Sequence, residues 1–242
     1  MKYLWSILIG LSFCIAVDAS ECISHRANVG DMPENSLEGL ALASAMKVSG
    51  IEFDVQISRD DVPFLYHNDE LGDGLLGKSC PRDQKIKNLD FSEIQGHCFL
   101  SNGEDLPLLA EALDLLSSFD GHLFIDLKQK ASSQFYQIIE NASLLQRPKL
   151  RFLSFKKRTL RPLRDRWPNA ETILLSRYIP RGLFYEGAGL NSRLGFFAPF
   201  FRWIGKDTAL WTMNSRSEVL RALDKKVDFV ITDHYELCKS LL

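Results

Sequence analysis

Glu52 and Asp54 occupy alternate positions of a short segment, Ile51-Glu-Phe-Asp-Val-Gln-Ile57. The intervening positions are apolar, so the segment is predicted to be a β-strand carrying both carboxylates on one face, about 6–7 Å apart. In an antiparallel sheet such a face can simply be solvated. In a parallel sheet it is covered, and two neighbouring buried anions are costly unless a hard cation with oxygen ligands binds them. The pattern therefore indicates either a solvated strand face or a metal site.

His67 is a candidate for proton transfer beside these acids. The segment Pro63–His67 is strand-like and too close to the preceding strand for a helix to intervene, which predicts an antiparallel hairpin. With the turn near Asp60–Asp61, we expect Asp54 to lie opposite His67. Histidine has an unperturbed pKa of ~6.5 and so suits general acid or base chemistry, although a lone histidine at a strand end is usually structural.

Two further polar pairs follow strand candidates: His25 with Arg26, and Asp126 with Lys128. At the carboxyl ends of barrel strands they would lie beside the two carboxylates. Arginine offers a forked donor suited to phosphate, whereas Asp126 and Lys128 taken alone are equally explained as a neutral surface pair. Together these residues favour metal-assisted cleavage of an anionic ester. The chain has no Gly-x-Ser-x-Gly turn that would indicate a serine hydrolase.

Alternating strands and helices are predicted to position these groups. Strands are expected at Cys22–His25, Ile51–Ile57, Pro63–His67, His122–Leu127, Arg151–Phe155, Thr172–Leu175, near Gly195–Ala198, at Ala209–Met213 and at Phe229–Thr232. Helices are expected at Asn35–Ser49, with Asn35 as the cap, and at Leu108–Leu116, Ser132–Leu145, Lys157–Trp167, Ser217–Leu223 and Tyr235–Leu241.

This alternation implies right-handed crossovers and a parallel sheet. About eight units in this length predict an α/β fold: a (β/α)8 TIM barrel in a single domain, with an insertion after the second strand, at residues 68–105. A doubly wound open sheet is the alternative, but we find no Gly-rich phosphate loop to support it.

The composition excludes several classes of protein. Of 242 residues, 45% are hydrophobic and 25% are charged, which is typical of a folded chain rather than a disordered one. The formal net charge is −2, so there is no electrostatic reason to expect a nucleic-acid partner.

The first nineteen residues are predicted to be a signal peptide. The apolar run Tyr3–Val17 is short for a ~20-residue membrane span, and Val17 and Ala19 are the small residues that signal peptidase prefers. We expect cleavage near Ala19, export to the periplasm or the medium, and no stable membrane span in the mature chain. An uncleaved anchor or a buried first helix is the alternative.

Four cysteines would remain after cleavage, an even number in an oxidising compartment. Cys80 and Cys98 flank one polar, irregular segment, which favours a local disulfide between them. Cys22 and Cys238 would then join the two ends of the domain. Four unpaired, buried thiols are the alternative.

The motifs resemble those of the glycerophosphodiester phosphodiesterase family. His25-Arg26 followed by Pro33-Glu34-Asn35-Ser36 is similar to the family's His-Arg…Pro-Glu-Asn-Thr signature, and Ile51–Val55 with His67 resembles its metal strand and second histidine. Weaker similarities follow in order at Ile125–Lys128, Leu153–Phe155, Trp211–Asn214 and Val230–Asp233. The resemblance extends over about residues 23–235, and Asp126 stands where the family carries Glu.

The resemblance implies that residues 20–242 form a TIM barrel that hydrolyses a small-molecule glycerophosphodiester or lysophospholipid to glycerol 3-phosphate and an alcohol. It implies one divalent cation, Mg²⁺ or Ca²⁺, on Glu52, Asp54 and Asp126, with His25 and His67 as the acid–base pair. Arg26 and Lys128 would bind the phosphate, Trp211 would line the pocket, and Glu34 and Asn35 would support the site. Helix capping explains Asn35 equally well. Residues 68–105 would shape the glycerol side.

Two other functions are compatible with the same fold. One is a phospholipase D-like enzyme acting on lysophospholipid or sphingomyelin; the other is a non-catalytic phospholipid-binding barrel. The aromatic segment Phe196–Trp203 would favour the first if it formed a membrane-facing patch, but packing into the core is the favoured explanation. Loss of a histidine or a metal-binding acid would favour the second, and none is lost.

Overall fold

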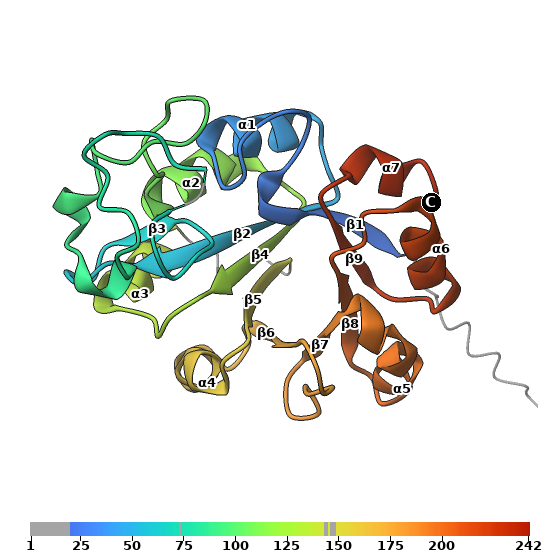
Figure 1. Cartoon of the computed structure of the whole chain (residues 1–242). Helices are drawn as coiled ribbons and strands as arrows, with labels where there is room; N and C mark the ends of the chain where they lie inside the picture. Colours follow the sequence, from blue (N-terminus) through green and yellow to red (C-terminus); the bar gives the residue numbers. More distant parts are fainter. Residues whose placement is uncertain (1–19, 73, 143–144, 146–148) are drawn as a thin grey trace, which may run out of the picture.

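The computed structural model describes residues 20–72, 74–142, 145 and 149–242, and within these residues the chain forms a closed parallel barrel (Figure 1). Its eight strands are β1 (Glu21–Ser24), β2 (Gly50–Ile57), β4 (His122–Leu127), β5 (Leu150–Ser154), β6 (Glu171–Ser176), β7 (Gly187–Asn191), β8 (Asp207–Trp211) and β9 (Phe229–Thr232). Neighbours pair in parallel, and β1 pairs with both β9 and β2, which closes the sheet. The predicted (β/α)8 TIM barrel is confirmed.

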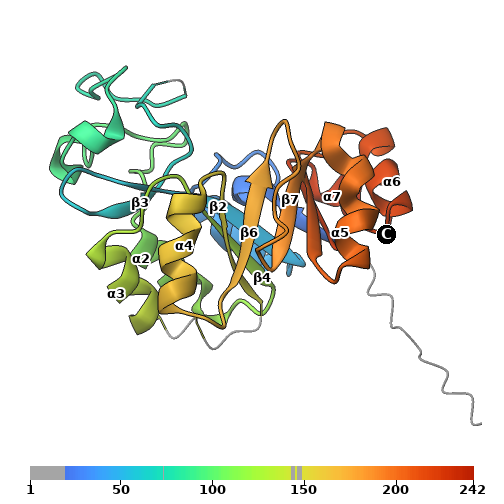
Figure 2. The same cartoon turned by 90° about the horizontal axis from the view of Figure 1, so that it is seen from below.

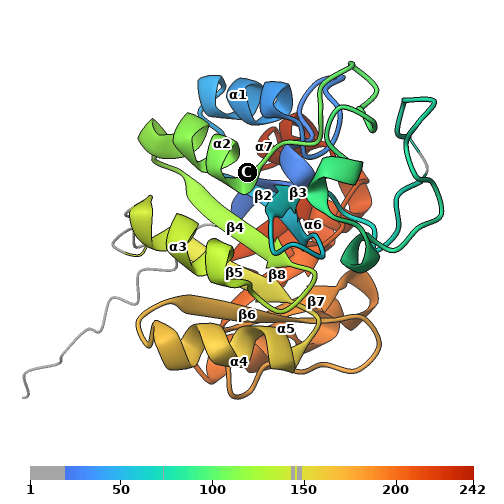
Figure 3. The same ribbon diagram turned by 90° about the vertical axis from the view of Figure 1, so that its left-hand side faces the viewer.

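Helices cover the outside of this barrel (Figures 1 and 3). They are α1 (Leu37–Ala45), α2 (Leu109–Leu115), α3 (Ser133–Asn141), α4 (Lys157–Arg166), α5 (Ala198–Trp203), α6 (Arg216–Asp224) and α7 (Tyr235–Lys239). Serine side chains cap three of them: Ser36, Ser132 and Ser215 each accept a hydrogen bond from a backbone N–H three residues on. Residues 177–186, between β6 and β7, form no helix.

Two apolar layers hold the barrel together. One lies between the strands and the surrounding helices, and the other fills the barrel interior with Ile23, Phe124, Leu153, Ile173, Leu175, Ala209, Phe229 and Ile231. The polar side chains of the predicted site share that interior face of the strands. Because the interior apolar layer fills the space next to them, these polar groups are confined to one end of the barrel.

The predicted insertion follows β3 (Pro63–Leu65), which pairs antiparallel with β2, and forms a lobe beside the barrel (Figure 2). The lobe has its own apolar cluster, including Leu71, Ile86 and Ile94. Cys80 and Cys98 form a disulfide within it. Cys22 and Cys238 form a second disulfide that joins β1 to α7. Both favoured pairings are confirmed, and the alternative of four free thiols is wrong.

The expected register of the hairpin is wrong by one residue. Val55 pairs with Leu65 and Ile57 with Pro63. Continuing this register places Tyr66, and not His67, opposite Asp54. The turn is centred on one residue, because Ser58 N donates to Val62 O at 3.1 Å and encloses three residues. His67 therefore lies beyond the strand ladder.

The strand expected near Gly195–Ala198 is also wrong, because a 3₁₀ helix occupies Ser192–Phe197 and β7 lies earlier in the chain. The sequence pattern does not predict β7 because the strand contains two glycines, and glycine is disfavoured in strands. The fold requires them: a Cβ at Gly189 would lie 2.4 Å from Leu175 Cδ2, and one at Gly187 would lie 2.9 Å from Ile173 Cγ1.

Asn35 is not the cap of α1. It adopts a positive φ of 59°, and Ser36 caps the helix by accepting from Gly39 N at 2.9 Å. The side chain of Asn35 is thereby free to turn toward β2.

The aromatic segment Phe196–Trp203 is only partly core. Phe201 is buried, whereas Phe196, Phe200 and Trp203 are 65%, 46% and 82% exposed. Phe196 lies in the 3₁₀ helix Ser192–Phe197, and Phe200 and Trp203 lie on the outer face of the short helix α5, so core packing is wrong for these three side chains. No helix among the residues described here is long and apolar enough to cross a membrane. The predicted signal peptide, Met1–Ala19, lies outside the described residues.

Candidate active site

A cavity of about 140 Å³ opens among the carboxyl ends of the barrel strands. Its polar wall consists of His25, Arg26, Glu52, Asp54, His67, Asp126 and Lys128, and its other wall includes Leu153, Phe155, Leu175, Arg177, Trp211, Thr212 and Ile231. In barrels of this kind the loops at the carboxyl ends of the strands carry the chemistry. Eight of the ten predicted site residues therefore line one cavity, and Glu34 and Asn35 lie behind it.

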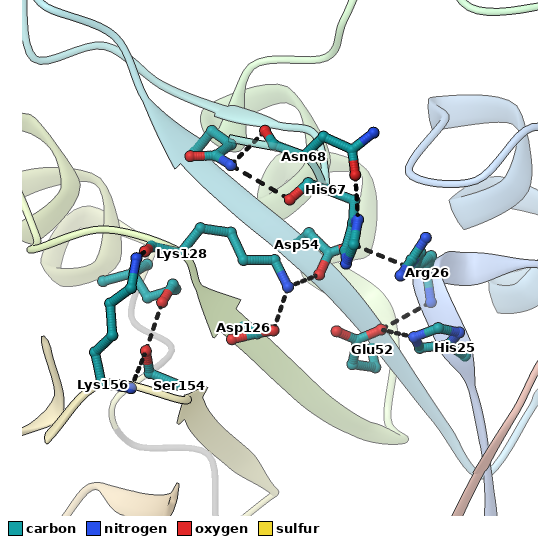
Figure 4. A network of polar contacts seen from close by, with 12 residues as sticks. His25, Arg26, Glu52, Asp54, His67, Asn68, Asp126, Lys128, Ser154 and Lys156 are labelled. Atoms are coloured by element: carbon teal, nitrogen blue, oxygen red, sulfur yellow. Dashed lines mark hydrogen bonds and ion pairs between the residues drawn. The ribbon is translucent and has the colours of Figure 1, made fainter. Parts of the chain in front are cut away.

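Three buried carboxylates form the floor of the site (Figure 4). Asp54 on β2 lies beside Asp126 on β4 in the parallel register, and Glu52 lies two residues earlier on the same face of β2. One oxygen from each lies within 4.8 Å of the others, and each residue is at most 3% exposed. The Lys128 ammonium binds Asp54 Oδ1 at 2.5 Å and also contacts Asp126.

The charges of this cluster are not balanced. Burial and the neighbouring Asp54 raise the pKa of Glu52 to about 7. Burial also raises the pKa of Asp126, although Lys128 opposes the shift. Burial acts on Asp54 in the same way, but the charges of Lys128 and Arg26 outweigh it and hold that pKa well below its usual range. Three carboxylates therefore share two cations, Arg26 and Lys128, and the raised pKa of Glu52 reflects both its burial and this shortage of positive charge.

His25 is oriented by the carboxylate of the residue that follows the last strand, β9. Its Nδ1 lies 2.5 Å from Asp233 Oδ1, and its Nε2 faces Glu52 Oε2 at 4.0 Å. Asn214 holds Asp233 in turn, donating from Nδ2 to Oδ2 at 2.5 Å. Burial lowers the pKa of His25. The hydrogen bond to Asp233 and the charge of Glu52 together raise this pKa by more than burial lowers it, so the net shift is upward.

His67 enters the cavity from the loop after β3. Its Nδ1 contacts Asn68 Oδ1 at 2.8 Å, and Gln56 on β2 fixes the loop by donating to the carbonyl oxygens of His67 and Asn68 at 3.3 and 2.6 Å. Burial lowers the pKa of His67, while the charge of Asp54 acts against that shift. Both histidines are thus held through Nδ1, which leaves each Nε2 available for proton transfer.

The loop after β1 brings Arg26 over the acids. Arg26 has a positive φ of 54°, which lets its backbone N–H donate to Glu52 Oε2 at 2.8 Å while its side chain reaches Glu34 Oε2 at 2.6 Å and Asp54 Oδ2 at 3.2 Å. Asn35 binds Asp54 twice, through its side-chain amide to Oδ2 and its Oδ1 to Asp54 N. Glu34 and Asn35 therefore position Arg26 and Asp54.

The opposite wall is largely apolar. It includes one residue that the sequence analysis missed, Arg177. Trp211 packs edge-on against Phe155 with 5.3 Å between ring centroids, and Trp211 Nε1 is buried without a hydrogen-bond partner among the described residues. Arg177 lies over the Phe155 ring, 5.5 Å from its centroid. Its position directly after β6 was the available signal. Asp233 ends the motif-like segment Val230–Asp233, but the sequence pattern does not predict its role beside His25.

Comparison with known proteins agrees with this geometry. A model of the Glycerophosphoryl diester phosphodiesterase family matches residues 25–176, more than half of the chain. Over 241 aligned residues the chain is 22% identical to a glycerophosphodiester phosphodiesterase of Caldanaerobacter subterraneus subsp. tengcongensis, covering 91% of this chain and 96% of that protein.

Solved structures share the fold. A glycerophosphodiester phosphodiesterase from Parabacteroides distasonis superposes with a TM-score of 0.80 at 22% identity, over 93% of this chain and 97% of that one. A phosphodiesterase from Oleispira antarctica, in complex with the product sn-glycerol-3-phosphate, gives a TM-score of 0.75 at 24% identity over 92% and 96%.

The fold and the matches define a TIM-barrel phosphodiesterase. This chain belongs to the glycerophosphoryl diester phosphodiesterase family and is an enzyme of that class.

Proposed function

We propose that this enzyme hydrolyses glycerophosphodiesters to glycerol 3-phosphate and an alcohol, using one divalent cation and the pair His25 and His67. One observation carries the proposal: two anchored histidines and three buried carboxylates face one small cavity in a chain of this family. The neighbour from Oleispira antarctica, which was solved with sn-glycerol-3-phosphate, supports the same product.

The acidic cluster fits a hard divalent cation. Its ligands are all carboxylate oxygens, which favours Mg²⁺ or Ca²⁺ over a thiophilic or imidazole-bound metal. Asp126 Oδ1 is buried with no hydrogen-bond partner among the described residues, as expected of an atom meant for another ligand. When bound by Glu52, Asp54 and Asp126, the cation would neutralise charge on the phosphate and lower the pKa of a coordinated hydroxyl.

The substrate supplies its own nucleophile in this proposal. The hydroxyl next to the esterified carbon of glycerol lies close to phosphorus, so its attack has a high effective concentration. Its oxygen bonds to phosphorus as the ester oxygen of the alcohol departs, giving a cyclic glycerol phosphate. One histidine removes the hydroxyl proton and the other protonates the departing alcohol. Water then bonds to phosphorus as the bond from phosphorus to the neighbouring oxygen breaks; the histidines exchange roles, and glycerol 3-phosphate is released.

The remaining residues of the cavity bind and orient the substrate. Arg26 and Lys128 lie beside the acids, where their charges would also stabilise the phosphate. Asp233 orients His25 and stabilises its protonated form. Trp211 offers the unpartnered Nε1–H to a substrate oxygen and closes the apolar side.

Export is part of the proposal. We propose that Met1–Ala19 is a signal peptide removed near Ala19, which places the enzyme in the periplasm or outside the cell. The two disulfides support an oxidising compartment, because such bonds are rare in the cytosol.

Product analysis tests the function. We expect glycerol 3-phosphate and free alcohol from glycerophosphocholine and glycerophosphoethanolamine, and none in excess chelator. Cleavage of lysophosphatidylcholine or sphingomyelin alone would instead indicate the phospholipase D-like alternative, which the exposed Phe196 and Trp203 would suit. No cleavage of any of these substrates by the metal-loaded enzyme would overturn the proposal. Phosphorus NMR should reveal the cyclic phosphate, and undiminished hydrolysis of a substrate methylated on the neighbouring hydroxyl would exclude it.

A further inference from the structure

A basic groove borders the catalytic cavity on the side of β4 and β5. It has a volume of about 550 Å³ and is lined by Gln129, by five cationic side chains and by two acidic ones: Lys85, Lys87, Lys130, Lys156, Arg158, Asp69 and Glu70. The groove therefore carries a net charge of +3 in a chain whose formal net charge is −2. Such a concentration of one sign creates a local potential that attracts anions.

The groove and the cavity are built from the same strand ends. Lys128 lines the cavity and the next two residues line the groove. Lys156 Nζ donates to the backbone oxygen of Lys128 at 2.7 Å (Figure 4). On the other side, Gln56 holds both the His67 carbonyl and Asp69. A ligand that contacts Lys128 and His67 thus has the groove directly beside it.

The catalytic cavity is too small to enclose a whole diester. Its volume is about 140 Å³, whereas sites that enclose a small molecule typically span roughly 300–1,000 Å³. A diester bound with its phosphate among these residues would therefore extend at least one substituent outside the cavity. The groove is a concave, adjacent space for that part of the substrate.

The cations of the groove are largely uncompensated. Lys85 lies 3.9 Å from Glu70, but Lys87, Lys130, Lys156 and Arg158 make no ion pair with any carboxylate in the described part of the chain. Lys156 uses one of its three donors on the Lys128 carbonyl and keeps two. The basic groups farther along α4 are compensated: Arg161 pairs with Asp165, Arg164 with Glu186 and Arg166 with Glu140.

The cations that gather at the start of α4 destabilise that end of the helix, and a bound anion would offset this effect. Lys156 occupies the N-cap of α4, Lys157 and Arg158 follow in its first turn, and no acidic residue stands there. The N-terminus is the positive end of the helix dipole, so cations there are repelled, and acidic residues are normally preferred at this end. A multiply charged anion in the groove would offset this repulsion and pair with the free donors together.

We propose that the groove binds a phosphate carried by the alcohol half of the substrate, so that the preferred diester is one whose departing alcohol is itself phosphorylated. The insertion residues that line the groove would then serve the alcohol side, and not the glycerol side that the family resemblance implies for residues 68–105. The inference rests on the proposed function. A phosphomonoester presents up to two charges and three acceptor oxygens, which matches several lysines and one arginine better than a single carboxylate does.

Paired substrates test it. Kinetics are compared for glycerophosphoinositol and glycerophosphoinositol 4-phosphate, which differ only in the added phosphate, for the wild-type enzyme, Lys130→Gln/Arg158→Gln, and Lys157→Gln/Arg161→Gln. The last variant removes the same charge from α4 outside the groove. We expect the wild type to prefer the phosphorylated substrate about tenfold in kcat/KM, mainly through KM, and to lose this preference in salt.

The groove variant should lower that preference to about twofold, and the matched control should keep it, with unchanged melting temperatures for both. Equal rates on the two substrates, or an equal drop of the preference in both variants, would overturn the groove assignment while leaving the hydrolase function intact. If neither substrate were cleaved, and glycerophosphocholine and glycerophosphoethanolamine were not cleaved either, the proposed function would fail. Calorimetry would then decide on the groove alone, by whether inositol 4-phosphate binds, inositol does not, and Lys130→Gln/Arg158→Gln abolishes binding.

Discussion

The two ends of the barrel each hold a cluster of buried charges, arranged in opposite ways. At the carboxyl end the acids are inside, with side-chain exposures of 4%, 1% and 4% for Glu52, Asp54 and Asp126. At the amino end the buried charge is Arg151, 8% exposed, and its acidic partners Glu171 and Asp207 are 38% and 41% exposed.

The charges of the amino-end cluster are paired with one another, although Glu171 Oε2 makes no hydrogen bond among the described residues beside its ion pair with Arg151. Arg151 contacts Glu171 at 2.8 Å and Asp207 at 3.0 Å, donates to His122 Nδ1 at 2.6 Å and lies 4.5 Å from the Phe229 ring centroid. His122 Nε2 in turn contacts Glu21 at 3.0 Å.

The carboxyl-end cluster has no such balance. It keeps an orphan oxygen on Asp126 and a Glu52 pKa of about 7. Strand β4 thus contributes His122 to a paired charge cluster at one end and Asp126 to a cluster that could hold an added cation at the other.

The largest expected effect is the removal of divalent cations. Excess EDTA should abolish hydrolysis, and Mg²⁺ or Ca²⁺ should restore it, because the three acids lack a sufficient counter-charge of their own. The cation should also raise the melting temperature, since it binds only the folded site. Full activity in excess EDTA would show that the carboxyl-end cluster, like the amino-end one, needs no added cation.

Histidine substitutions separate the ends directly. His25→Ala and His67→Ala should each lower kcat by roughly 10²–10⁴, the usual range for a positioned acid or base. His122→Ala is the matched control at the amino end, and its activity per folded molecule should stay within about twofold of wild type. Near-wild-type turnover in either of the first two variants would exclude that histidine from the reaction.

The disulfide of the insertion should stabilise without contributing to chemistry. Cys80→Ser/Cys98→Ser should lower the free energy of unfolding by about 3 kcal/mol, the entropic estimate for a loop of this length. Urea denaturation with and without the two substitutions measures it, and Leu242→Ser, a surface change at the chain end, is the control. An unchanged denaturation midpoint would show that the insertion is held by its apolar cluster instead.

Loss of the amino-end cation should affect stability alone. Arg151→Met should lower the free energy of unfolding by about 2 kcal/mol, less than for a fully buried pair because the acidic partners reach water. Thermal denaturation gives the stability, and kcat/KM should be unchanged. A fall in kcat/KM with stability intact would show that the two clusters are coupled through the barrel.

The smallest expected effect is on pH dependence. Burial and the charge of Arg151 lower the pKa of His122, so the unfolded chain binds a proton at this residue more readily than the folded one. Stability from His122 is therefore present above the unfolded pKa of ~6.5 and is lost as pH falls below it. His122→Gln should flatten the curve of unfolding free energy against pH as the pH falls below about 6.5. An unchanged curve would assign the acid sensitivity to other groups.

Much of the barrel follows from local pattern. Strand β4 at His122–Leu127 was predicted residue for residue, and α4 at Lys157–Arg166 within one residue, because strongly patterned segments form the same element wherever they pack. Strand β7 was missed for the opposite reason. Gly187 and Gly189 have poor strand propensity and are required only because the side chains of β6 occupy the space where their own would lie.

The hairpin and Asn35 show where spacing alone is insufficient. Whether a turn centres on one residue or between two shifts the register by one position, and the sequence Ser58–Val62 is compatible with both. Asn35 has the side chain of a helix cap. Its positive φ and its two hydrogen bonds to Asp54 become visible only when β2 lies beside the first loop.

The sequence by itself determined the period of the elements and the identity of the acids, histidines and cations, since strand alternation and motif spacing are local properties. Tertiary structure alone decided which groups share a cavity. It paired His25 with Asp233 across 208 positions, placed Arg177 over Phe155 and gathered Lys87, Lys130 and Arg158 around one groove. The physical reason is closure of the barrel: it brings the carboxyl ends of distant strands together, and charges interact through space rather than along the chain.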